Sequence, residues 1–288
     1  MIQNQDFINF IAPNQNRKNF LCSLIEKMNV DFSVISLEGK NHIYIKFSQK
    51  AYDPKYRIKT VLVHYDRFEK SPGANDNSAA VFQVLHWIKN NTIEKHNMRI
   101  FFTDGEEMGL PNTLKDKKND LQERQGSFAL AQVFKRLGIV NDDIFVLDGT
   151  GRGEVLVVST AGKASGSLHF QKQFSALYES AISLAKRTSP QGWITAPVPY
   201  GDNAGFISQG IPAVALTVLP KEEAKEYLRN LQKDKNFARN VMNHEKAKLP
   251  LTWCMMHTEM DNESNLTPSA FLLMKKFLNT LAKSKRIK

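Results

Sequence analysis

Strand patterns alternate with helix patterns along most of this chain. Apolar runs rich in Val, Ile, Leu and Phe predict strands at residues 60–64, 98–103, 144–147, 155–158 and 211–218. Apolar residues at helical spacing predict helices at residues 77–89, 127–136, 170–186 and 268–282. Because parallel strands need long crossover connections, which helices usually supply, this alternation favours a largely parallel sheet. We therefore predict an α/β fold, with helices on both faces of a mixed, mostly parallel sheet.

The first fifty residues show a different pattern. Residues 17–29 have the spacing of an amphipathic helix, and residues 32–37 and 42–47 alternate apolar with polar side chains around Glu38-Gly39. This pattern predicts a hairpin that adds antiparallel edge strands to the same sheet. The sequence has no internal repeat and no Gly/Ser-rich linker, so we predict one domain over residues 1–288, with insertions at 108–125 and 221–250.

Composition excludes a membrane-spanning protein and gives an expectation for the compartment. The chain has 288 residues, of which 42% are hydrophobic, enough for a sizeable core. Its longest stretch without charge, residues 203–220, contains two glycines and two prolines, which an apolar spanning helix disfavours. The N-terminus lacks the pattern of a secretory signal, and Cys22 and Cys254 form no disulfide framework. We expect a cytoplasmic protein.

The net charge of +10 raises the question of a nucleic-acid partner. However, the cations are scattered or concentrated in residues 275–288, and no RNA-recognition signature or zinc-finger spacing occurs. We predict no nucleic-acid partner and no membrane partner. The sequence carries no signal for the oligomeric state.

Acidic or imidazole side chains stand at the ends of the predicted parallel strands. These residues are His64, Asp66, Asp76, Glu106, Glu107 and Asp148. In open α/β sheets the ligand crevice lies beyond the carboxyl ends of the strands, so these side chains are expected at one edge. Singly, each has a structural explanation, such as a helix cap for Asp76 or a turn at Asp148. Together they favour a metal site.

A late histidine, His257, completes the set. Imidazole and carboxylate ligands suit zinc, and two ions about 3.5–4 Å apart need a shared carboxylate and further ligands on each ion. Cys254 lies three residues before His257. If this segment is a strand, the odd spacing points the two side chains to opposite faces, so we expect Cys254 in the core and not among the ligands.

Five segments resemble, in the same order, the motifs of the co-catalytic zinc aminopeptidases. This is metallopeptidase family 28, which also contains glutamate carboxypeptidase and glutaminyl cyclase. The segments are VHYD (63–66), SPGANDNSAA (71–80), DGEEMG (104–109), LD (147–148) and HT (257–258). The resemblance covers roughly residues 58–282 and implies the family's fold, a three-layer sandwich with the sheet in the middle.

The resemblance also implies a ligand set, two zinc ions per chain and a peptide substrate. Asp76 would bridge the two ions, with His64 and Asp148 on one of them and Glu107 and His257 on the other. The implied activity is removal of N-terminal residues from peptides. Manganese or cobalt could occupy the same oxygen and nitrogen ligands.

Two further residues receive catalytic roles. The resemblance makes Glu106 the general base, which accepts a proton from the metal-activated water. Asp66 lies two residues after His64 and so shares its strand face, where its carboxylate can orient the imidazole.

The segment before the last predicted strand departs from the family pattern. Many relatives have Ser-Asp-His there, whereas this chain has Gly201-Asp202-Asn203, without the histidine. Tyr200 stands near the position of a tyrosine that stabilises the oxyanion in some relatives. We assign Tyr200 and Asp202 as candidate substrate residues.

Two alternatives remain open. A glutaminyl cyclase would use a single zinc ion, and residues 257–266 resemble the cyclase ending, but Met256 stands where cyclases carry a tryptophan. A metal-binding or protein-binding module that has lost catalysis would retain the ligands, although Glu106, the implied base, is intact.

Overall fold

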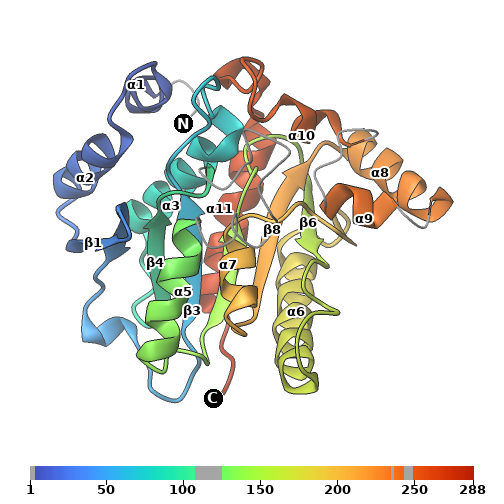
Figure 1. The fold of residues 1–288 in the computed structure, drawn as a ribbon. Coiled ribbons are helices and arrows are strands. Elements are labelled where there is room, and N and C mark those ends of the chain that lie inside the picture. The colour runs from blue at the N-terminus through green and yellow to red at the C-terminus, as the bar shows by residue number, and fades with distance from the viewer. Residues whose placement is uncertain (1–3, 108–124, 235–236, 243–248) are drawn as a thin grey trace.

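A computed structural model describes residues 4–107, 125–234, 237–242 and 249–288. Within these residues, eight strands form one sheet in the order β1-β2-β4-β3-β5-β8-β6-β7 (Figure 1). The strands are β1 (Phe32–Leu37), β2 (Lys40–Ile45), β3 (Lys59–His64), β4 (Met98–Thr103), β5 (Asp143–Leu147), β6 (Val155–Ser159), β7 (Trp193–Ala196) and β8 (Ala213–Leu219). Strands β4, β3, β5 and β8 pair in parallel, and so do β6 and β7. The predicted fold class is confirmed.

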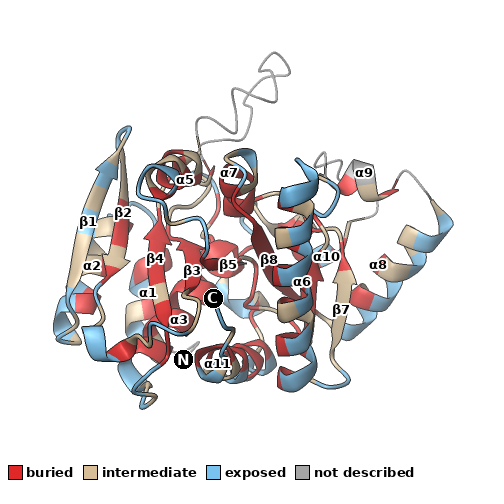
Figure 2. Ribbon diagram, turned by 90° about the horizontal axis from the view of Figure 1, so that it is seen from below, coloured by how far each residue is buried: buried red, intermediate tan, exposed pale blue. Residues whose placement is uncertain are grey.

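Helices cover both faces of this sheet, as predicted. They are α1 (Gln5–Ile11), α2 (Arg17–Lys27), α3 (Ala79–Asn90), α5 (Gly126–Arg136), α6 (Leu168–Thr188), α7 (Asp202–Ser208), α8 (Lys221–Lys233), α9 (Phe237–Met242), α10 (Leu251–Met255) and α11 (Pro268–Lys283). Short helical segments are η1 (Gln49–Ala51), η2 (Ala74–Ser78) and η4 (Glu263–Asn265). Figure 2 shows α5 and α7 on one side of the sheet and α3 and α11 on the other. Among the described helices, none is both long and apolar enough to cross a membrane.

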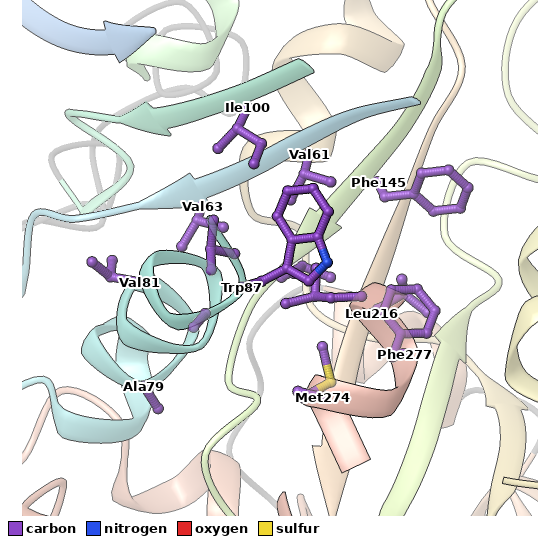
Figure 3. Close-up of a cluster of buried hydrophobic side chains, with 14 of the residues drawn as sticks. Val61, Val63, Ala79, Val81, Trp87, Ile100, Phe145, Leu216, Met274 and Phe277 are labelled. Atoms are coloured by element: carbon purple, nitrogen blue, oxygen red, sulfur yellow. The ribbon is translucent and has the colours of Figure 1, made fainter. Parts of the chain in front are cut away.

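The central strands are buried on both faces, which explains their unbroken apolar runs. In β3, Val61 and Val63 face the layer of α3 and α11, where they join the same core as Trp87 and Phe277 (Figure 3). Leu62 points to the opposite face and packs in the core under α5 and α7. Successive side chains of β3 therefore alternate between the hydrophobic cores on the two faces of the sheet.

The order of the strands places a crevice beside β3. The chain passes from β3 to β4 through α3 on one face, and then from β4 to β5 through α5 on the other. As a result, β4 and β5 flank β3 on opposite sides, and the connections leave in opposite directions. This reversal is the topological switch point at which open α/β sheets form their ligand crevice.

The edges of the sheet show what the periodicity predicted and what it did not. The predicted hairpin is present, because β1 and β2 pair antiparallel and β2 joins β4. By contrast, β7, α1 and α7 were not predicted, since elements of four to seven residues are too short for a clear period. The antiparallel pairing of β6 with β8 was also not predicted.

The two predicted insertions have different outcomes. Residues 108–124 lie outside the described part of the chain, so the first cannot be placed. In the second, α8 and α9 pack over β6 and β7, with Tyr227 and Phe237 buried against Trp253 of α10. The Tyr227 hydroxyl donates a hydrogen bond to the Pro197 carbonyl at 2.6 Å. This charged segment therefore covers one end of the sheet with its own small core.

Arg17 connects the N-terminal helices to the segment that follows β3. Its buried guanidinium donates hydrogen bonds to the carbonyl oxygens of Tyr65 at 3.1 Å, Asp66 at 3.2 Å and Pro72 at 2.7 Å. It also lies over the ring of Phe10, 4.7 Å from its centroid. Arg17 thus satisfies three backbone acceptors in the connection between β3 and η2.

Replacement of Arg17 by Met should lower the free energy of unfolding by about 3 kcal/mol. The substitution keeps the apolar stem but leaves these carbonyls without their charged donor. The matched control is Lys27→Met on the exposed side of the same helix, where a change within about 0.5 kcal/mol is expected. Urea denaturation measures both, and equal stabilities for the two variants would refute this role for Arg17.

Candidate metal centre

The carboxyl edge of the central strands gathers the predicted side chains. His64 ends β3, Asp148 directly follows β5, and Glu106 and Glu107 follow β4. Since β4 and β5 are the two neighbours of β3, all of these residues leave the sheet at one edge. This is the switch point described above, so the strand order itself brings the acidic groups and the imidazole together.

Asp76 reaches the same place from η2. Its backbone is not helical (φ −110°, ψ 87°), and its N–H and that of Asn75 donate to the Asp261 carboxylate at 3.0 and 2.7 Å. Gly73 begins this turn with φ +62°, where a Cβ would lie 2.6 Å from the Asp76 carbonyl oxygen. A glycine is therefore required at position 73, and Asp261 holds the backbone that carries Asp76.

His257 lies beyond α10 in a left-handed backbone conformation, with φ +62°. Non-glycine residues adopt this conformation at a cost of about 1–3 kcal/mol, and such residues cluster at functional sites. The imidazole stacks on the ring of Phe68, with 5.0 Å between centroids and 28° between planes. This contact fixes the orientation of the ring toward the acidic groups.

The side chains form two groups that share Asp76. In the first, His64 Nε2 lies 3.1 Å from Asp76 Oδ1 and 3.7 Å from Asp148 Oδ1. In the second, His257 Nε2 lies 3.2 Å from Asp76 Oδ2 and 3.0 Å from Glu107 Oε2. Each oxygen of the Asp76 carboxylate therefore faces a different group.

These separations fit metal ligands. Ligand atoms about 2.0–2.1 Å from a tetrahedral zinc ion lie about 3.3 Å from one another. The distances of 3.0–3.7 Å agree with that geometry. Moreover, His64 Nε2 and both Glu107 carboxylate oxygens are buried without a hydrogen-bond partner, which a folded protein avoids unless another group satisfies them. Within the described residues, donor type, spacing and unsatisfied atoms all fit a pair of metal ions.

A third group of possible ligands combines His64, Glu106 and Glu107. Glu106 therefore stands close enough to the centre either to contribute an oxygen or to act beside it.

The charges at the centre shift the pKa values of its groups. Burial lowers the pKa of His257, but contacts with Asp76 and Glu107 outweigh burial and raise it to about 10. The pKa of His64 is likewise raised well above its usual value, because nearby carboxylates, Asp148 foremost, outweigh burial. Burial and the charge of Asp76 raise the pKa of Glu107 to about 7. Without an ion, the imidazoles therefore hold protons at neutral pH.

Glu106 lies in a strongly acidic environment. Burial and the negative charges of Glu107, Asp148 and Asp202 raise its pKa well above the usual value, although His64 opposes them. Gly201 lies close to it, because a Cβ at this position would be 3.3 Å from Glu106 Oε1 and 2.8 Å from Asp148 Oδ2. A side chain at position 201 would intrude on both carboxylates.

Asp66 contacts two members of the centre. Its Oδ1 lies 3.4 Å from His64 Nδ1, and its Oδ2 accepts the backbone N–H of Glu107 at 3.0 Å. The predicted side-by-side placement of Asp66 and His64 is therefore present. The contact with Glu107, a residue on a different strand connection, was not predicted.

The remaining predicted residues have mixed outcomes. Asp202 is fully buried and bonds to the Thr103 hydroxyl, so it lies beneath the centre without a surface for substrate. Tyr200 is half-buried and adjoins Gly201, next to the carboxylates. Cys254 lies in helix α10 rather than in a strand, and its thiol donates to the Leu249 carbonyl at 3.6 Å. The strand argument for its orientation was therefore wrong.

Asp261 is the functional residue that the sequence analysis missed. It lies four residues after His257 and is 3% exposed. An acid so close to a candidate metal ligand could have been singled out as a supporting residue. Its hydrogen bonds to the Asn75 and Asp76 backbone, however, depend on a contact across 185 residues that spacing cannot predict.

Known proteins resemble this chain in sequence family and in fold. The sequence profile described as "Peptidase family M28" matches residues 43–282. A glutaminyl cyclase from Bacteroides thetaiotaomicron has a similar structure, with a TM-score of 0.64, 17% identity, and coverage of 98% of this chain and 95% of the other. A leucine aminopeptidase precursor from the same organism is also similar, with a TM-score of 0.64, 16% identity, and coverage of 98% of this chain and 94% of the other.

A zinc aminopeptidase from Bacillus subtilis is also similar, with a TM-score of 0.53, 19% identity, and coverage of 84% of this chain and 49% of that chain. A search of curated proteins found no match. At these identities the structural likeness establishes the fold alone.

Proposed function

The chain belongs to peptidase family M28 and is a zinc metallopeptidase, and we propose that it is an aminopeptidase acting through two zinc ions. The observation that supports this most directly is the division of the Asp76 carboxylate between two ligand groups. A shared carboxylate with further ligands on each side is the arrangement that a pair of close metal ions requires.

In this proposal His64 and Asp148 hold one ion, and Glu107 and His257 hold the other. Asp76 bridges them, Asp66 orients His64, and Asp261 holds the Asp76 backbone. This assignment is supported by the distances within the two groups and by the unsatisfied buried atoms.

Glu106 is the proposed general base. When bound, the two ions supply Lewis-acid chemistry: they polarise the scissile carbonyl and lower the pKa of water to roughly 7. The same positive charges lower the pKa of Glu106 from the high value that its acidic surroundings impose. Glu106 then accepts a proton from the attacking water and passes it to the leaving amine.

Tyr200 and Asp202 complete the proposal. Tyr200 directly precedes Gly201, whose backbone faces the carboxylates of Glu106 and Asp148, and its proposed role is to stabilise the developing oxyanion. Asp202 is assigned a supporting role rather than a substrate contact, because it is buried and bonded to Thr103.

The proposed location is the cytoplasm. The low cysteine content of the sequence agrees with a reducing compartment.

Zinc binding should release protons at pH 7. The raised pKa values of His64 and His257 mean that both imidazoles are protonated before the ions bind. Zinc must displace these protons and also the proton that part of the Glu107 population carries, so we expect at least two protons released per chain and an affinity that rises with pH. Isothermal titration calorimetry in buffers with different ionisation enthalpies measures the number. Binding without proton release would contradict the ligand assignment.

The activity is tested by amine release from a panel of short peptides with the zinc-loaded protein. We expect hydrolysis of peptides with a free N-terminus and none of the same peptides after N-acetylation. Cleavage of acetylated peptides at equal rates would contradict aminopeptidase action, and no cleavage of any peptide would contradict the peptidase proposal.

Glutaminyl cyclase is the second candidate, because the similar cyclase structure matches the chain as well as the aminopeptidase precursor does. Met256, beside His257, contacts the position where Gly149 would carry a Cβ, 2.5 Å from Met256 Cε. The flexible, apolar side chain of Met256 therefore packs against the backbone of Gly149, the residue that follows Asp148. Formation of pyroglutamate from an N-terminal glutamine peptide, with one bound zinc ion, would favour the cyclase.

A further inference from the structure

A basic cavity lies at the opposite edge of the sheet from the metal centre. Lys59 opens β3 and Asp143 opens β5, whereas His64 and Asp148 stand at the other ends. With about 3.3 Å per residue, the two ends of β3 are about 16 Å apart. A cavity of about 190 Å³ occupies this edge, lined by residues of β3, β5, α6 (Leu168–Thr188) and the C-terminal end of the chain. The cavity is therefore separate from the catalytic crevice.

Five cations line the cavity and one carboxylate opposes them. The lining cations are Arg57, Lys59, Arg187, Lys285 and Arg286. The carboxylate is Asp143, whose Oδ1 accepts hydrogen bonds from Arg57 Nε and Arg286 Nη1, both at 2.8 Å. A single buried carboxylate leaves an excess of four positive charges around a small space. Arg187 and Lys285 are exposed, so solvent screens part of this charge, and an anion bound between the cations would offset the rest.

The buried lysine adds charge without an anionic partner of its own. Lys59 is 5% exposed, and its ammonium donates to the carbonyl oxygens of Leu281, Ala282 and Ser284 at 2.9, 3.2 and 2.6 Å. All three donors are thus used by the end of α11 (Pro268–Lys283). Lys59 therefore adds positive charge to the cavity but no free donor. The N–H groups available to a ligand belong to the three lining arginines.

Arg187 presents an available guanidinium. It stands in the last turn of α6, on the same face as Ser180, Ser183 and Leu184, which also line the cavity. Among the described residues, it forms no hydrogen bond or ion pair. Arg57 and Arg286 each use one N–H group on Asp143, which leaves further N–H groups on both.

The C-terminal residues are held in place before any ligand binds. The backbone N–H of Arg57 donates a hydrogen bond to the backbone carbonyl of Arg286 at 2.8 Å, and Tyr56 and Ile287 form an antiparallel β-bridge. Arg286 is therefore fixed against the amino ends of β3 and β5. Pre-arranged donors reduce the entropy that a ligand loses on binding.

We propose that this cavity binds a phosphate group, either as inorganic phosphate or on a small phosphate ester. Guanidinium groups match the planar, bidentate contacts that phosphate oxygens accept, and a dianion offsets the excess charge better than a chloride ion. Serine hydroxyls beside Arg187 offer further donors. This site does not depend on the peptidase activity or on bound zinc.

The test compares Arg187→Gln with a matched control, Arg136→Gln. Arg136 is exposed and occupies the last turn of α5 (Gly126–Arg136), as Arg187 does in α6, so both substitutions remove the same helix-end charge. Calorimetric titration of the zinc-loaded full chain uses inorganic phosphate and glycerol 3-phosphate in chloride buffer of constant ionic strength. Phosphate bound by zinc contributes equally in both variants, so the difference between them reports the cavity.

We expect Arg187→Gln to raise the dissociation constant at least about tenfold, while Arg136→Gln matches the unmodified chain. Tighter binding of glycerol 3-phosphate would identify an ester as the ligand, and tighter or equal binding of inorganic phosphate would identify the free anion. The proposal is overturned if neither probe binds in an Arg187-dependent way. It is also overturned if the control weakens binding equally.

Discussion

Glu106→Gln should reduce the turnover number by about 10²–10⁴-fold while leaving the zinc content unchanged. The amide has nearly the shape of the carboxylate but cannot accept a proton from the attacking water. Since the proposed ligands of both ions are other residues, the ions should remain. The measurement pairs steady-state hydrolysis of an aminoacyl peptide with elemental analysis of the same protein sample.

The matched control for this variant is Glu179→Gln, an exposed position in α6 that should retain full activity. Loss of zinc together with activity in Glu106→Gln would instead make Glu106 a ligand, in agreement with its place in the third possible ligand group. Undiminished turnover would remove Glu106 from the reaction altogether.

Asp76→Asn should remove nearly all activity, by about 10³-fold or more, because it disrupts both ion positions at once. The substituted amide keeps one carbonyl oxygen and presents an NH₂ group where the second ligand oxygen stood. Both imidazoles also lose the buried negative charge that faces them. We expect the zinc content to fall by at least one ion per chain.

Circular dichroism separates this effect from unfolding, with Asp31→Asn at an exposed position as the control for the same change in charge. A variant that keeps both ions and its activity would show that Asp76 does not bridge them. A variant that keeps one ion and full activity would show that the reaction needs only one.

The sequence predicted the layers of this fold because its central strands are buried on both faces. The runs at residues 61–63 and 144–147 are apolar throughout, and such runs separated by helical patterns have few alternative arrangements. The antiparallel insertion of β6 beside β8 and the four-residue strand β7 could not be predicted in this way. Both depend on pairing partners far away in the sequence, and β7 is too short to show a period.

The candidate site was predicted from the carboxyl ends of the strands, and these ends do meet in the structure. The supporting contacts were harder to predict. Asp261 holds Asp76 across 185 residues, and Arg17 holds the segment after β3 from outside the matched family region. Such contacts depend on tertiary packing, which no local pattern encodes. The burial of Asp202 was missed for the same reason.

The number of zinc ions per chain tests the two-ion centre most directly. Elemental analysis should be performed on protein purified without chelator and dialysed against trace zinc. The division of Asp76 between two ligand groups predicts two ions per chain. One tightly bound ion would contradict the bridged centre and favour the cyclase, and the absence of bound zinc would contradict the metal site itself.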